Sequence, residues 1–168
     1  MTANEGVERM TKVLAKRKAE DTKLLGKNVL VFLNYGETAS EDAPKWALLG
    51  GQRSASWSAT ADEVDLTDKT SGGYGDSDQG TKSTELSVEL IVKKGDEAVK
   101  ALRQAFDEGE AVDVLRWAKD GQSIRNWYAV TEMSEDAAHD DAAVLSVTFK
   151  GKGRPIYTED MEDPREGV

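Results

Sequence analysis

Two short runs of alternating apolar and polar residues constrain the fold of this chain more than any other feature. In the first run, Val64 and Leu66 alternate with polar side chains. In the second run, Leu86, Val88 and Leu90 do the same. Successive side chains of a β-strand point to opposite faces, so each run predicts a strand with one buried and one open face.

A stretch rich in Gly, Ser and Asp, from Asp68 to Lys82, separates the two runs. If the two strands pair, this stretch is the tip of a long hairpin, with Tyr74 as its one aromatic residue. Loops of this length without secondary structure are uncommon, and they are usually either functional or disordered. The tip is therefore a candidate functional element.

The open face of this hairpin is predicted to be acidic. Its candidate residues are Glu63, Asp65, Glu85 and Glu89. Like charges placed directly opposite each other weaken a sheet, so a purely acidic face carries a cost in stability. Two interpretations stay open: a merely solvated face, or a face selected to stay negative.

The rest of the body is predicted to contain further strands. The run Val29–Leu33 is apolar throughout, which is typical of a strand buried on both faces. The stretch Lys45–Arg53 follows, with a bulge or bend expected at Gly50-Gly51. Asp120-Gly121 is a strong hairpin signal. The remaining strands are predicted at 112–119, 123–133 and 144–150.

One helix is predicted between Asp96, which can cap its N-terminus, and Gly109, which can end it. Its apolar residues form a single stripe made of Ala98, Val99, Leu102, Ala105 and Phe106. A helix with one stripe packs on one sheet. The predicted fold is therefore mainly β (α+β): an antiparallel sandwich or barrel of about seven strands with one flanking helix.

Charge divides the chain into three parts. The protein has 22 basic and 32 acidic side chains, a net charge of −10. Residues 1–27 hold seven of the basic and four of the acidic ones, a net of +3, so the remainder carries −13. We assign residues 1–25 to a basic N-terminal arm, either flexible or docked on another surface. Residues 26–155 form the body, and residues 156–168 an acidic C-terminal tail that is mobile or an interaction arm.

The residue types that most catalytic and metal sites need are scarce. There are 0 Cys, which excludes disulfides and thiolate sites. The one histidine, His139, lies in a polar loop among Asp136, Asp140 and Asp141, whose spacing does not fit a calcium loop. The longest apolar run is too short to span a bilayer, and the start lacks a signal peptide pattern. We expect a soluble, intracellularly made protein that is not an enzyme and has no cofactor or metal.

The tryptophans leave another possibility open. All four lie in predicted strands beside apolar neighbours: Trp46, Trp57, Trp117 and Trp127. Buried in this way, they would belong to the core or to subunit contacts. Exposed together, they would form a platform for carbohydrate.

The order of several segments carries a family resemblance. A strand that opens with Gly26–Val31 is followed by Gly50–Arg53, by Ala61–Lys69 and by the Gly-rich tip. Further on, a helix ends in Ala105–Glu110, and a last strand closes with Val147–Gly153. Over roughly residues 24–155, this order resembles the major tail tube proteins of long-tailed, non-contractile bacteriophages.

The resemblance implies a virion structural protein, made and assembled in the bacterial host cytoplasm. In such proteins six copies close into a ring, and the rings stack into the tail tube through which DNA passes. It further implies that the partners are other copies of the chain and the tape-measure, tail-initiator and tail-terminator proteins. DNA would pass transiently without sticking, and no membrane would be involved.

The resemblance also assigns roles to residues. The acidic residues Glu63, Asp65, Glu85 and Glu89 would line the lumen, where they would repel DNA phosphates. Contacts between subunits would come from the hairpin tip, with candidates Asp68, Lys69, Tyr74, Asp76, Asp78 and Lys82. Contacts between rings would come from the arm, with candidates Met10, Leu14, Arg17, Leu24 and Leu25. This arm is longer and more basic than the start associated with the family.

Three alternatives remain at the level of sequence. An inner-tube protein of a contractile tail, gene-transfer particle or secretion system would share the fold and differ in its outer surface. A monomeric β-sandwich binding module would show exposed aromatic residues and no assembly. An enzyme would have to work with a single histidine and open carboxylates.

Overall fold

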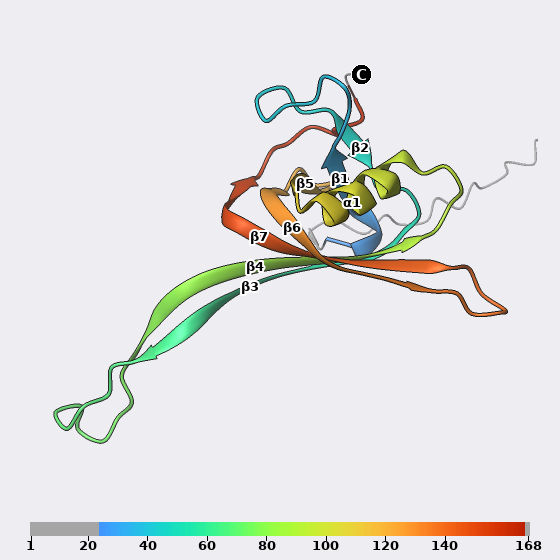
Figure 1. The fold of residues 1–168 in the computed structure, drawn as a ribbon. Coiled ribbons are helices and arrows are strands. Elements are labelled where there is room, and N and C mark those ends of the chain that lie inside the picture. Colours follow the sequence, from blue (N-terminus) through green and yellow to red (C-terminus); the bar gives the residue numbers. More distant parts are fainter. Residues whose placement is uncertain (1–23, 167–168) are drawn as a thin grey trace, which may run out of the picture.

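The computed structural model describes residues 24–166 as a mainly β fold of seven antiparallel strands and one α-helix (Figure 1). The predicted fold class is confirmed. A short 3-10 helix, Gly26–Asn28, leads into the first strand, and α1 (Glu97–Glu108) lies between β4 and β5. The strands are β1 (Val29–Asn34), β2 (Trp46–Leu48), β3 (Gln52–Asp65), β4 (Ser77–Ile91), β5 (Ala111–Ala118), β6 (Ser123–Asp136) and β7 (Val144–Thr158).

All seven strands belong to one sheet in the order β2-β1-β5-β6-β7-β4-β3. The sheet bends back on itself, because β1 and β5 share a core with β4 and β7. This core includes Val31, Leu33, Val114, Leu86, Val88, Leu145, Val147 and Phe149. At the start of β3, the Gln52 amide donates to the Val31 carbonyl (2.7 Å) and accepts from the Val31 N–H (2.9 Å), which joins the two layers.

The helix forms where the sequence predicts it. The carboxylate of Asp96 accepts from the N–H groups of Ala98 (3.1 Å) and Val99 (3.4 Å), and Gly109 ends the helix in the left-handed region, with φ 68°. Ala98, Val99 and Leu102 pack into the core, whereas Phe106 is 46% exposed. The helix therefore covers the core side of the bent sheet and leaves the other side of β4 and β7 bare.

The β3–β4 hairpin has longer strands and a shorter tip than predicted. Its tip consists of Leu66–Asp76, and the predicted tip residues Asp78 and Lys82 lie on β4 instead. The prediction was wrong here because the strand-forming residues near Lys82 are serines, threonines and Gly80, which give no apolar alternation. Paired backbones hold these residues in the ladder despite their modest strand propensity.

The first residues of the predicted acidic tail belong to the body. β7 continues through Thr158, which pairs with Ser123. Beyond it, the Met161 carbonyl accepts from the Trp117 indole N–H (3.0 Å), and the Met161 N–H donates to Gly121 (2.9 Å). Gly121 has a φ of 97°, and a Cβ there would lie 2.7 Å from the Glu159 carbonyl oxygen. Only glycine fits this close approach without strain.

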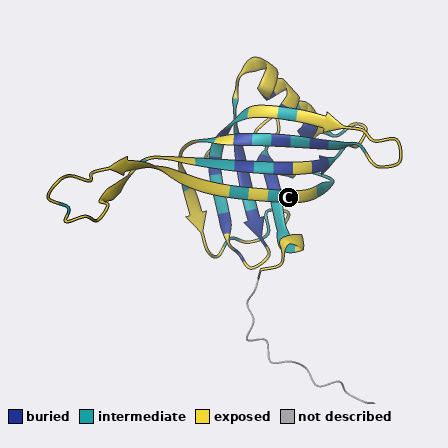
Figure 2. Cartoon of the chain, turned by 90° about the horizontal axis from the view of Figure 1, so that it is seen from below, coloured by how far each residue is buried: buried dark blue, intermediate teal, exposed yellow. Residues whose placement is uncertain are grey.

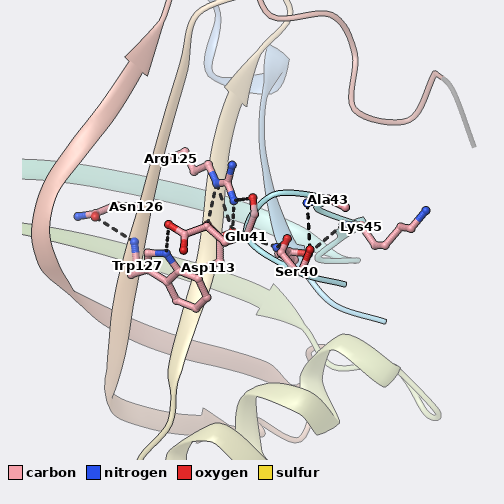
Figure 3. Close-up of polar contacts among 9 residues, drawn as sticks. Ser40, Glu41, Ala43, Lys45, Asp113, Arg125, Asn126 and Trp127 are labelled. Atoms are coloured by element: carbon pink, nitrogen blue, oxygen red, sulfur yellow. Dashed lines mark hydrogen bonds and ion pairs between the residues drawn. The ribbon is translucent and has the colours of Figure 1, made fainter. Parts of the chain in front are cut away.

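A buried ion pair fastens the loop between β1 and β2 to the sheet (Figure 3). Asp113 on β5 is 2% exposed and accepts from Arg125 on β6, with 2.6 Å between Nη2 and Oδ2 and 3.1 Å between Nε and Oδ1. The same Nη2 donates to the Glu41 carbonyl (2.8 Å), and the Trp127 indole donates to the Glu41 carboxylate (3.3 Å). The guanidinium lies 5.1 Å from the centre of the Trp46 ring. The hydrogen bond to Asp113 raises the pKa of Arg125.

Removing the cation from this pair tests its contribution to the fold. We expect Arg125→Met to lower the free energy of unfolding by about 3–5 kcal/mol, because it leaves the Asp113 carboxylate buried without its counter-ion. Urea denaturation followed by circular dichroism measures the change. The double variant Asp113→Asn/Arg125→Met should recover much of the loss, whereas Lys100→Met, at an exposed pair, should change stability little. Equal losses in the single and double variants would contradict this account.

Candidate functional site

The most distinctive surface is the side of β3, β4, β7 and β6 that points away from the core, seen from below in Figure 2. On β4, Leu86, Val88 and Leu90 are buried, so Glu85, Ser87 and Glu89 point to the opposite side. Because α1 lies on the core side, no helix of the described residues 24–166 covers this surface. We call it the open face.

The strand register shows which side chains share the open face. Ser54, Ser56 and Ser58 of β3 lie opposite Glu89, Ser87 and Glu85 of β4. On the other side of β4, Ser146, Thr148 and Lys150 of β7 lie opposite the same three residues. β6 extends the surface with Ser134 opposite Ser146 and Glu132 opposite Thr148. These paired positions thus carry mainly hydroxyl groups, with three carboxylates and the ammonium group of Lys150, and the exposed Lys152 follows on the same side of β7.

The ammonium group of Lys150 forms an ion pair with the Glu85 carboxylate on the adjacent strand. The hydrogen bond from Lys150 and the positive charge of Lys150 lower the pKa of Glu85. Glu85 therefore stays ionised over a wider pH range, but Lys150 offsets its charge. The open face is negative, yet less acidic than the sequence suggested.

The four predicted lumen residues do not share one face. Glu85 and Glu89 lie on the open face, but between Ala61 and Glu63 the register shifts by one additional residue in β4. β3 itself keeps its alternation, so Glu63 and Asp65 follow the side of Trp57, which packs against the core. The prediction of a single acidic face was wrong because Val64 and Leu66, whose alternation suggested the buried side, lie beyond the core and are exposed, so they do not mark the core-facing side of β3.

The tip of the β3–β4 hairpin has a structure of its own. The N–H of Leu66 donates to the Asp76 carbonyl (2.8 Å), which closes its base. The Asp68 carboxylate accepts from the Thr70 N–H (2.7 Å) and hydroxyl (2.6 Å), and these bonds lower the pKa of Asp68. Tyr74 is 82% exposed, and Lys69 is also exposed. The tip therefore presents an aromatic ring on a shaped polar loop.

The arm candidates are only partly visible. Leu24 and Leu25, at the start of the described chain, are 36% and 54% exposed. Met10, Leu14 and Arg17 lie outside the described residues. The arm's part in contacts between rings therefore stays a prediction.

The tryptophans form no exposed platform. Trp117 is buried, and Trp57 packs edge-on against Tyr157 with ring centres 6.1 Å apart. Trp46 and Trp127 are half-buried around Arg125. These positions favour core and loop packing over carbohydrate binding.

The described residues contain neither a cluster of metal-ligand side chains nor a helix that could span a membrane. Across residues 24–166, no three His, Asp or Glu side chains gather closely enough to hold a metal ion. His139 is exposed near Asp140, as the sequence predicted. None of the helices in this part of the chain is long and apolar enough to cross a membrane.

The hydroxyl residues of the open face were missed by the sequence predictions, although a signal exists. Ser54, Ser56, Ser58 and Thr60 alternate strictly with Ala55, Trp57 and Ala59. A period of two predicts a strand even when its polar side is made of small hydroxyls. The signal is weak because the other side of the stretch is mostly alanine.

Comparison with known families decides the identity of the chain. A family model described as phage tail tube protein matches residues 24–157. The chain belongs to the phage tail tube protein family. It is therefore a structural component of the virion tail, as the sequence resemblance implied. No curated protein matches the sequence.

Solved structures of assembled tails share the fold. One is the tail of an empty gene transfer agent particle with C6 symmetry, at 22% identity and a TM-score of 0.69, covering 81% of this chain and 99% of that one. Another is the SPP1 tail tube, at 13% identity and a TM-score of 0.68, covering 83% of this chain and 81% of that one. A third is the anti-feeding prophage baseplate, at 10% identity and a TM-score of 0.63, covering 81% of this chain and 97% of that one.

The Lys150–Glu85 pair can be tested by titration. We expect Lys150→Met to raise the pKa of Glu85 toward its ordinary range, because both the hydrogen bond and the positive charge are lost. The NMR chemical shift of the Glu85 side-chain carboxyl carbon, measured as a function of pH, gives this pKa. Because the folded pKa of Glu85 is lowered, the pair stabilises the fold at neutral pH, and this contribution is lost as the pH falls. An unchanged titration of Glu85 would show that the pair does not form in solution.

Proposed function

We propose that six copies of the chain close into a ring and that the rings stack into the tail tube, with the open face lining the lumen. The observation that carries this proposal is the four-strand layer β6-β7-β4-β3, which has one bare polar side and two unpaired edges. The C6 symmetry of the similar gene transfer agent tail supports the number of copies.

The two edges of this layer suit closure of a ring. Among the described residues, β3 pairs on one side only, with β4. The second half of β6 also pairs on one side only, since its ladder with β5 ends at Ala129 opposite Ala111. Unpaired N–H and C=O groups at an edge readily pair with another chain. Joining β3 of one copy to β6 of the next would continue the sheet around a closed barrel.

The chemistry of the open face suits a passage for DNA. Phosphates are held in proteins mainly by arginine, lysine and backbone N–H groups. On this face Lys150 is already paired with Glu85, Glu89 and Glu132 add negative charge, and the exposed Lys152 lies two residues further along β7. DNA would therefore meet mainly hydroxyl groups and carboxylates, which do not attract phosphates. Tape-measure, initiator and terminator proteins and assembly in the host cytoplasm are proposed on family membership alone.

Electron microscopy of the purified protein tests assembly. We expect negative staining to show hollow tubes or stacked rings at high protein concentration. Replacing the tip, Leu66–Asp76, by Asn-Gly should leave a folded protein that cannot form tubes, because the tip is proposed to contact other subunits. Asp65 and Ser77 are directly paired, so a two-residue turn can join them. Normal tubes from this variant would refute the role of the tip.

Reversing charge on the open face tests the lumen. We expect Glu85→Lys/Glu89→Lys to assemble into tubes but to slow DNA ejection from particles by about tenfold or more, because each ring would present new phosphate-binding cations. The matched control is Asp107→Lys/Glu108→Lys on α1, which lies on the other side of the sheet and should leave ejection unchanged. Equal ejection rates for both variants would place the open face outside the lumen.

A further inference from the structure

A groove lies at the base of the β3–β4 hairpin, on the side opposite the open face. It has a volume of about 810 Å³ and is formed by β3, β4 and the end of β7. Its floor is made of small or apolar residues, among them Ala59, Ala61, Gly151 and the half-exposed ring of Tyr157. Two cationic side chains, Lys82 and Arg154, stand in its wall, and no acidic residue of the described chain lines it.

The turn between β6 and β7 has the complementary composition. Residues 137–143 read Ala-Ala-His-Asp-Asp-Ala-Ala, and all but the last are exposed. Asp140 and Asp141 stand at the turn, with Asp136 at the end of β6 just before it. The turn thus offers two carboxylates flanked by alanine methyl groups, and the groove offers two cations beside an apolar floor, so the two surfaces are complementary.

The groove and the turn lie at opposite ends of the molecule. The β3–β4 hairpin and the β6–β7 turn project in opposite directions in both views (Figures 1 and 2). β7 itself connects the turn to the groove, and the ten residue-to-residue steps from Ala143 to Gly153 span about 33 Å when extended. The turn therefore cannot reach the groove of its own chain.

Stacking requires complementary surfaces at opposite ends of a subunit. Rings stacked head to tail bring one end of each subunit against the other end of a subunit in the next ring. We propose that the β6–β7 turn of one subunit docks in the groove of a subunit in the adjacent ring, with Asp140 and Asp141 facing Lys82 and Arg154. This inference rests on the proposed function, since it needs stacked rings. The groove lies away from the open face, so the docked turn leaves the lumen clear.

A charge exchange tests the contact. We expect Asp140→Lys/Asp141→Lys and, separately, Lys82→Glu/Arg154→Glu to raise the protein concentration needed for tubes by about tenfold or more, because like charges then meet across the interface. A copy carrying all four changes should form tubes near the wild-type concentration. Sedimentation and negative-stain electron microscopy measure both. All these side chains are exposed, and matching thermal melts would show that the variants fold.

Control variants separate this contact from a general effect of charge. Asp107→Lys/Glu110→Lys makes the same change in net charge elsewhere on the surface and should leave tube formation unchanged. If wild-type protein forms no rings or tubes, the proposed function fails. If it forms tubes and the two reversals do so equally well, only the docking of the turn is overturned.

Cross-linking identifies the occupant of the groove. Because the chain has 0 Cys, Asp140→Cys and Ala61→Cys introduce the only thiols. Oxidised tubes containing a mixture of the two single variants should give disulfide-linked dimers, whereas each variant alone should give few. If Ala61→Cys instead links to Leu14→Cys in the N-terminal arm and not to Asp140→Cys, the arm occupies the groove and the proposal is wrong.

Discussion

The pairing of β4 with β7 is the interaction on which the rest of the structure depends. Leu86, Val88 and Leu90 lie opposite Phe149, Val147 and Leu145, and all six side chains are buried. Burying each large apolar side chain contributes about 1.5–3 kcal/mol, so this ladder holds a large share of the core. Every neighbouring element packs against it: α1 and the β1–β5 layer on its core side, β3 and β6 along its edges.

A strand buried on one face only leaves the other face available for function. Because side chains alternate, the ladder that buries Val88 also fixes Ser87 and Glu89 on the opposite side. The register of the core therefore determines the register of the open face. A slip of one residue would bring carboxylates into the core and leucines to the surface. The chemistry of the proposed lumen is thus set by the same pairs that stabilise the fold.

The sequence predicted the elements whose signals are local. Asp96 and Gly109 mark both ends of α1, and Asp120-Gly121 marks the β5–β6 turn. It misplaced Glu63, because the neighbouring Val64 and Leu66 lie beyond the core, where an apolar side chain no longer marks the core-facing side of the strand. It also could not place Met161, because Met161 contacts Trp117, which lies far from it in the sequence. Local chemistry predicts where elements begin and end, whereas pairing and docking decide which faces they share.

Hydroxyl groups solve a problem that a purely acidic lumen would create. In a closed ring, carboxylates directly opposite each other on neighbouring strands would repel across every pair, in every copy. On the open face, Glu85 instead lies between Ser58 and Lys150, and Glu89 lies between Ser54 and Ser146. Each carboxylate thus has uncharged or oppositely charged neighbours within its own sheet. Such a surface keeps the sheet stable, and the pairing of Lys150 with Glu85 weakens the attraction of this cation for a passing phosphate.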